Sequence, residues 1–150
     1  MRKLSVVLVV VLSGCFAPPD EMIAPPAAAE PLPARPGTAL TADGCVASKL
    51  RFTRAQACWN DGWIELCAER AGGTPLVNEL RQIAPTIFIS DSPMGRVGCN
   101  PATELTAFYA FDRAQACEAD GATMRLSAWE TVCRLSAVEG TRIFVPGFGE

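Results

Sequence analysis

The sequence contains no histidine. Histidine is the usual base beside a nucleophilic serine or cysteine, so its absence excludes the Ser-His-Asp and Cys-His arrangements. Zinc is also disfavoured, because the seven cysteines include no Cys-x-x-Cys pair and no imidazole is available as a ligand. The sequence therefore predicts a non-catalytic chain that carries no metal and no cofactor.

Two patterns of charge are missing as well. The chain has 13 basic and 16 acidic side chains, and the basic ones form no stripe that could follow a phosphate backbone. Calcium needs about six to eight oxygen ligands, and no acidic run has the spacing of a calcium loop. The sequence thus predicts neither a nucleic-acid partner nor a calcium site.

The apolar run at the amino terminus, Leu4 to Leu12, is too short for a membrane span, which needs about 20 apolar residues. Arg2 and Lys3 precede it, a pattern typical of a secretory signal over residues 1–14. Removing those two residues with the signal leaves 11 basic against the same 16 acidic side chains.

The residues Leu12-Ser13-Gly14-Cys15 follow the apolar run and resemble the lipobox of bacterial lipoproteins. The resemblance implies cleavage before Cys15, a diacylglycerol on its thiol and a fatty acid such as palmitate on the new amino terminus. The alternative is an ordinary secretory signal with Cys15 as a bystander, although an unpaired thiol is a liability in an oxidising compartment. Phe16 is not the aspartate associated with retention at the inner membrane, so the resemblance favours the outer membrane where the organism has one.

Residues 15–42 carry the lipidated cysteine and are rich in proline and alanine. Frequent proline favours extended polyproline segments, so this region is expected to be a semi-rigid tether. A recognition site for a proline-reading partner is the alternative. The folded domain is expected over residues 43–150.

Two stretches of this domain are nearly the same. Phe52 to Gly62 (FTRAQACWNDG) returns as Phe111 to Gly121 (FDRAQACEADG), and Trp-x-x-x-Cys follows each, at Trp63 and at Trp129. A chain of this length supports one modest core and not two. The two modules, about 43–91 and 97–150, are therefore expected to share a single core.

Each repeat is expected to begin a short helix at a cap residue, Thr53 or Asp112, and to end it at a glycine. Strands are expected over residues 86–90 and 142–145, with approach strands near 50–52 and 107–111. Further helices are expected over residues 63–70, from Thr74 onward, and from Ser127 as cap to Gly140. The predicted fold is α+β, a small disulfide-stapled domain of duplicated helix-and-strand modules with the helices on a mainly antiparallel sheet.

Six cysteines remain for this domain, and in an exported chain they predict three disulfides. Because each module holds three cysteines, at least one bridge must join the modules. If the modules are equivalent, only pairings that are symmetric under their exchange remain. Among these we expect the pairs Cys58–Cys67, Cys117–Cys133 and Cys45–Cys99.

Phe111 to Gly121, followed by Met124 and by Trp129 to Cys133, is similar to a segment of the formylglycine-generating, sulfatase-modifying family. That family adopts a variant of the C-type-lectin fold, so the resemblance implies a lectin-like, disulfide-bonded fragment. The family's catalytic cysteine pair and metal ligands have no counterpart here, and the resemblance implies no oxidase activity.

Three residues are candidates for a binding site. Asp61 and Asp120 recur beside the glycines that end the repeated helices, where turn chemistry is the alternative explanation. Trp59 has no aromatic counterpart in the second repeat, so it is a candidate surface for a sugar or a protein, with a core position as the alternative. Trp63 and Trp129, which the repeats share, are expected in the core.

Other polar residues receive simpler interpretations. Arg54 and Arg113 oppose the dipole of their helices, which indicates a specific partner such as a carboxylate in the opposite module. The cluster that contains Asp91, Asn100 and Glu104 is expected to be a solvated loop.

The function predicted from these patterns is a membrane-anchored envelope lipoprotein whose non-catalytic domain binds an unknown protein or glycan or has a structural role. An envelope enzyme or enzyme inhibitor that uses Asp61 and Asp120 is the alternative. A lipoprotein of the lysis or toxin-release kind is a third hypothesis, although such proteins are usually much shorter.

Overall fold

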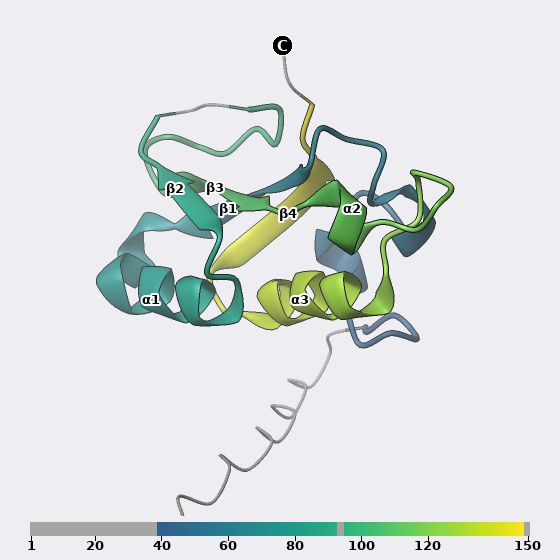
Figure 1. Ribbon diagram of the computed structural model, residues 1–150. Coiled ribbons are helices and arrows are strands. Elements are labelled where there is room, and N and C mark those ends of the chain that lie inside the picture. The colour runs from purple at the N-terminus through teal and green to yellow at the C-terminus, as the bar shows by residue number, and fades with distance from the viewer. Residues whose placement is uncertain (1–38, 93–94, 149–150) are drawn as a thin grey trace, which may run out of the picture. The chain divides into compact units, whose positions relative to one another are not determined.

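Four strands form one antiparallel sheet in the computed structural model, which describes residues 39–92 and 95–148. The strand order is β2-β3-β1-β4, and each neighbouring pair is antiparallel (Figure 1). Cys15, the predicted signal and residues 15–38 of the predicted tether lie outside the described residues. The strands are β1 (Trp63–Glu69), β2 (Ile87–Ser90), β3 (Glu104–Ala110) and β4 (Thr141–Pro146).

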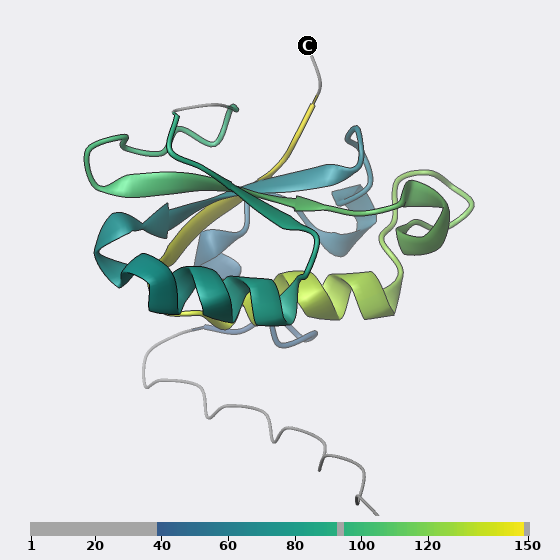
Figure 2. The same ribbon diagram turned by 60° about the vertical axis from the view of Figure 1, so that its left-hand side comes forward.

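Two longer helices lie on one face of the sheet (Figures 1 and 2). Helix α1 (Gly73–Ile83) connects β1 to β2, and helix α3 (Leu126–Ala137) connects β3 to β4. The order β1-α1-β2-β3-α3-β4, with this strand arrangement, is the connectivity of the split β-α-β, or ferredoxin-like, arrangement. The predicted α+β class is confirmed. The shorter helical turns are η1 (Ala47–Lys49), η2 (Arg54–Gln56), η3 (Arg70–Gly72) and α2 (Arg113–Ala116).

The core lies between the sheet and the two helices. Ile64, Leu66 and Ala68 alternate along β1 and are all buried in the main apolar cluster. Leu80 of α1 and Trp129 of α3 belong to the same cluster. The opposite face of the sheet carries the intervening residues of β1.

The predicted helix over residues 63–70 is wrong, because Trp63–Glu69 forms the central strand β1. Its apolar residues recur every second position, which suits a strand buried on one face. Trp129 is in the core as expected, with 2% of its surface exposed. Trp63 is only half-buried and lies on the face of β1 opposite the helices, so the expectation of a core position is wrong for it.

Three other predicted elements lie where they were expected. The helix at Thr74 is α1, and the two closing strands are β2 and β4.

Two further predictions hold only in part. Ser127 is not a cap, because α3 already begins at Leu126 and the extended residue Arg125 precedes it. Of the approach strands, 107–110 lies within β3, whereas Leu50 makes only an isolated bridge to Phe144.

The two repeats form similar turns, but the likeness ends after them. Asp112 accepts a hydrogen bond from the backbone N–H of Ala114, and the Thr53 N–H donates to the side chain of Gln56. The Trp-x-x-x-Cys segment that follows is strand β1 in the first half and helix α3 in the second. The structure therefore does not confirm duplicated modules.

Six cysteines form three disulfides as predicted, but the expected pairing is wrong. The bridges are Cys45–Cys133, Cys58–Cys117 and Cys67–Cys99, so all three join the two halves of the domain. Cys67 cannot reach Cys58, because Cys58 belongs to the core cluster while Cys67 alternates to the other face of β1. The observed pairing is nevertheless symmetric under exchange of the two repeats.

Candidate functional site

A groove of 550 Å³ opens beside α3, and its lining consists of residues 41–43, 47, 50–54, 56 and Trp129. This size is within the range of small-molecule pockets, about 300–1,000 Å³. The segment that lines it precedes β1, and η2 and the bridge from Leu50 to Phe144 fix its course. We call it the aromatic groove.

Two packed rings form the base of the aromatic groove. The centroids of Phe52 and Trp129 are 5.9 Å apart, and the rings meet edge to face at 74°. The indole N–H of Trp129 donates to a carboxylate oxygen of Asp43 at 3.2 Å. Only 2% of Trp129 and 8% of Phe52 is exposed, so neither ring offers an open face to solvent.

Two arginines give the aromatic groove a positive rim. The guanidinium of Arg54 donates to the carbonyl oxygen of Met124 at 2.9 Å, which fixes that side chain in place. Arg51 is exposed, and its guanidinium has no hydrogen-bond or ion-pair partner among residues 39–92 and 95–148. The lining also contains the carboxylate of Asp43, which already accepts the N–H of the Trp129 indole.

The repeated arginines have partners across the domain, as expected, but the partners are carbonyl oxygens and not carboxylates. Arg54 reaches Met124 in the second half, and Arg113 reaches Asn60 in the first half at 2.9 Å. The Cys58–Cys117 bridge joins the same two turns. These reciprocal contacts hold the two repeats against each other.

Asp120 stabilises the turn in which it lies. Its carboxylate accepts hydrogen bonds from the backbone N–H groups of Ala122 and Thr123, both at 2.9 Å, and from the Thr123 hydroxyl at 2.6 Å. The Thr123 hydroxyl, followed by the two N–H groups, holds the pKa of Asp120 below its usual value. This arrangement supports the turn explanation for Asp120.

The three candidate binding residues do not line the aromatic groove. Trp59 is 59% exposed, so the alternative of a core position is wrong. Asp61 is exposed in the same loop, where its backbone N–H donates to the carbonyl oxygen of Gly147 at 3.1 Å. Asp120 lies in the turn after α2.

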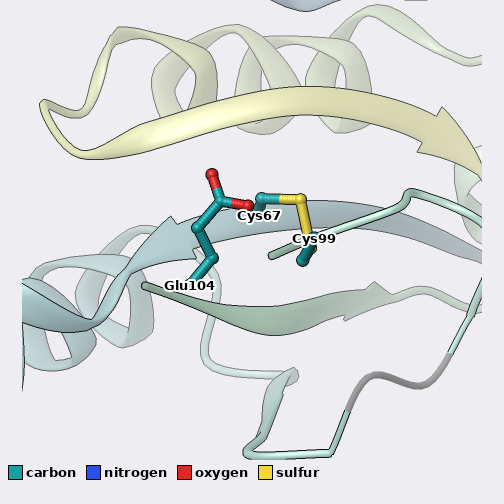
Figure 3. A group of neighbouring side chains, drawn as sticks. All are labelled: Cys67, Cys99 and Glu104. Carbon is teal, nitrogen blue, oxygen red and sulfur yellow. A yellow bond between two sulfur atoms is a disulfide. The ribbon is translucent and has the colours of Figure 1, made fainter. Parts of the chain in front are cut away.

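A second cluster lies on the sheet face opposite the helices. Figure 3 shows the Glu104 carboxylate pointing toward the Cys67–Cys99 disulfide, and the ligand atoms of these residues all lie within 4.8 Å of one another. Two thiolates and a carboxylate could hold a soft metal ion. In the oxidised chain, however, the disulfide uses both sulfur atoms.

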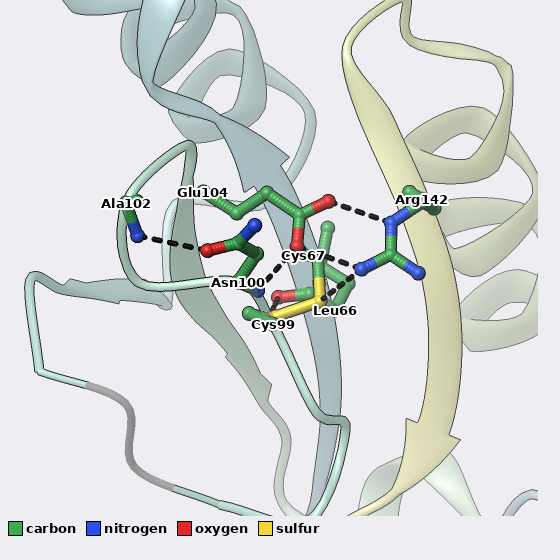
Figure 4. A network of polar contacts seen from close by, with 7 residues as sticks. All are labelled: Leu66, Cys67, Cys99, Asn100, Ala102, Glu104 and Arg142. Carbon is green, nitrogen blue, oxygen red and sulfur yellow. Dashed lines mark hydrogen bonds and ion pairs between the residues drawn. A yellow bond between two sulfur atoms is a disulfide. The ribbon is translucent and has the colours of Figure 1, made fainter.

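An ion pair stands beside this disulfide. Nε and Nη2 of Arg142 donate to the two carboxylate oxygens of Glu104 at 2.6 and 2.7 Å (Figure 4). The same carboxylate accepts the backbone N–H of Asn100 at 2.6 Å. The pKa of Glu104 is lowered mainly by the Arg142 hydrogen bonds, and Glu104 is 9% exposed, so the expectation of a solvated loop is wrong for it.

A bulge in β4 aims Arg142 at this cluster. Phe144 pairs with Leu66 and Arg142 with Cys67, so one residue of β4, Ile143, is extra. In a regular strand without the bulge, Arg142 would lie on the same face as Phe144, toward the helices. The sequence shows no signal for the bulge.

Glu65 is a buried carboxylate that fastens the loop between β2 and β3 to the sheet. It is 2% exposed and accepts hydrogen bonds from the backbone N–H groups of Arg96 at 2.6 Å and Val97 at 3.0 Å. Gly95, with a φ of 85°, lies against the same carboxylate, so a side chain there would collide with it. The alternation of β1 was the signal that could have placed Glu65 and Cys67 on one face.

Replacing Glu65 by alanine is expected to lower the free energy of unfolding by about 2–4 kcal/mol, because the N–H groups of Arg96 and of the buried Val97 lose a charged acceptor. Urea unfolding followed by tryptophan fluorescence measures the loss. Glu69→Ala is the matched control, since Glu69 is the exposed glutamate of the same strand. A loss for Glu65→Ala no larger than that of the control would contradict the fastening role.

No protein-family model matches the chain, and no curated protein or solved structure matches it. Within residues 39–92 and 95–148, no helix has the length and apolar character to span a membrane. The resemblances of residues 1–15 to a lipobox and of residues 111–133 to the sulfatase-modifying family stay predictions.

Proposed function

We propose that this chain is a lipid-anchored envelope protein whose folded domain binds a partner without catalysis. The lipobox-like residues before Cys15 support the anchor. Three disulfides support an oxidising compartment such as the periplasm or the cell surface. Phe16 favours the outer membrane where there is one.

The repeat has a structural role in this proposal. We infer that Phe52–Gly62 and Phe111–Gly121 are a duplicated turn whose copies clamp each other, and that the duplication does not extend to whole modules. The reciprocal contacts of Arg54 and Arg113, with the Cys58–Cys117 bridge between the turns, support this inference. Because η2 lies in the clamp, the clamp also fixes one wall of the aromatic groove.

The single observation that carries the binding function is the aromatic groove with its exposed Arg51. A guanidinium in a groove that polar and apolar side chains line together suits a ligand with a carboxylate beside an apolar group. A protein segment fits better than a glycan, because sugars need an open ring face and Phe52 and Trp129 meet edge to face and are buried. The ligand class is therefore an acidic segment of a partner protein.

The alternative, an envelope enzyme or inhibitor that uses Asp61 and Asp120, has less support. The Asp120 carboxylate is occupied by three donors of its own turn. Neither aspartate lines the groove.

A peptide titration tests the binding function. The probes are two short synthetic peptides with leucine between two glutamates or between two glutamines, added to isotope-labelled chain carrying Cys15→Ser for solubility. The glutamate peptide is expected to shift the NMR signals of groove residues and to bind about two- to fivefold more tightly, as for an exposed ion pair.

Arg51→Ala should remove this difference, whereas Arg134→Ala, at an exposed position of α3, should leave it unchanged. Equal affinity for both peptides, or signals that shift only outside the groove, would overturn the proposal. So would binding of an uncharged oligosaccharide in place of the peptide.

A further inference from the structure

The three disulfides differ in their access to solvent. Both cysteines of Cys45–Cys133 and of Cys58–Cys117 are buried, each with at most 6% of its surface exposed. In the third bridge Cys67 is fully buried, but Cys99, on the loop that leads into β3, is only half-buried. Only this bridge offers one accessible and one shielded end.

The shielded end has a cation beside it. Nη2 of Arg142 lies 3.9 Å from the Cys67 sulfur (Figure 4). A guanidinium stays charged at any pH a protein meets, and a nearby positive charge stabilises a thiolate. Arg142 is therefore placed to stabilise the negative charge that Cys67 would carry if the bond to Cys99 were broken.

The carboxylate of Glu104 has the opposite effect on a thiolate at Cys67. Glu104 faces the disulfide and shares the Arg142 guanidinium (Figures 3 and 4). Its charge disfavours a thiolate at Cys67 and offsets part of the Arg142 charge. The two members of this ion pair thus have opposite effects on the leaving group.

We propose that Cys67–Cys99 is a thiol-exchange site that accepts electrons from a dithiol of a partner protein. A thiolate of the partner attacks the Cys99 sulfur, the Cys67–Cys99 bond breaks, and Cys67 leaves with the electron pair as a thiolate beside Arg142. The second thiolate of the partner then attacks its own sulfur in the mixed disulfide and releases Cys99 as a thiolate. The partner ends as a disulfide, and this chain holds two thiols once two protons are taken up, so two electrons have moved.

Contacts that do not involve sulfur also hold the loop before β3. Glu65 binds the N–H groups of Arg96 and Val97 independently of the sulfur atoms. The other two bridges still join the halves of the domain through the core. Exchange at Cys99 therefore does not require unfolding.

The test uses dithiothreitol as the probe dithiol on the folded, oxidised chain. Samples taken over time are alkylated, digested and analysed by mass spectrometry, which shows when each cysteine becomes free. Cys67 and Cys99 are expected to be labelled together while the other four cysteines stay protected. Simultaneous labelling of all six, or earlier labelling of another pair, would overturn the proposal.

Two charge variants separate electrostatics from a loss of structure. Arg142→Gln should slow the exchange at Cys99 by about threefold or more, and Glu104→Gln should accelerate it by a similar factor. Both variants break the same ion pair, so a purely structural role would move both rates in the same direction, and that result would overturn the proposal.

Arg142→Lys keeps the charge and should restore most of the rate that Arg142→Gln loses. Circular dichroism shows that each variant is folded before its rate is compared. The groove peptides of the binding test are unaffected by these changes, so failure of one proposal leaves the other standing.

Discussion

Replacing Cys45 and Cys133 together by alanine is expected to lower the free energy of unfolding by about 3–4 kcal/mol. The two cysteines have a sequence separation of 88 residues, but the intact Cys58–Cys117 bridge shortens the loop that they close to about 30 residues. A crosslink over a loop of that length still removes much of the entropy of the unfolded chain. Domains of this size are stable by only about 5–15 kcal/mol, so the variant should be close to unfolding at 37 °C.

The measurement is urea unfolding of the double variant against the oxidised parent. The matched comparison is Cys67→Ala with Cys99→Ala, whose sequence separation is 32 residues and whose loss should be similar, because the two loops have similar lengths in the chain that keeps its other bridges. A loss below about 2 kcal/mol for the first pair would contradict this assignment of stability to the Cys45–Cys133 bridge.

Replacing Cys15 by serine is expected to move the chain from the membrane fraction to the soluble fraction almost completely. Each buried methylene contributes about 0.8 kcal/mol, and several acyl chains on one residue would together anchor the protein stably. The residues that follow Cys15 are the same in both forms, so the change isolates the lipid. Fractionation of the producing cells with an antibody against the domain measures it, and intact mass reports the acyl groups.

Ser13→Ala is the control for the anchor, because it keeps a small residue before the cysteine and should leave the chain in the membrane. If Cys15→Ser also stays in the membrane fraction, the lipobox interpretation of residues 12–15 is wrong. The binding proposal for the aromatic groove would remain, since it rests on the groove residues between Thr41 and Gln56 and on Trp129.

Local patterns in the sequence predict much of the secondary structure. The β-branched and aromatic runs at residues 86–90 and 142–145 are strands β2 and β4, and the periodic segment at Thr74 is α1. Residues 63–70 were misassigned because a Trp-x-x-x-Cys segment was expected to behave alike in both repeats. Tertiary contacts decide whether this segment is a strand or a helix, since one copy lies in the centre of the sheet and the other is part of α3.

The disulfide pairing was likewise predicted only in part. Symmetry correctly restricts the pairings, because the observed set exchanges Cys45–Cys133 with Cys67–Cys99 when the repeats are exchanged. The choice within that set depended on the misassigned helix.

The site residues depend on contacts that the sequence does not display. Glu104 and Arg142 are 38 residues apart, and only the bulge at Ile143 brings Arg142 opposite Cys67. The aromatic groove likewise joins residues before β1 to Trp129 on α3. Trp59, a candidate from the sequence, is exposed as a binding residue would be, but it does not line the groove.

The most direct test of this fold is the disulfide map of the oxidised, exported chain. Digestion without reduction, followed by mass spectrometry, should give linked peptides for Cys45–Cys133, Cys58–Cys117 and Cys67–Cys99. A bridge between Cys58 and Cys67, or between Cys117 and Cys133, would contradict it, because Cys67 would then have to leave the face of β1 that carries Glu65.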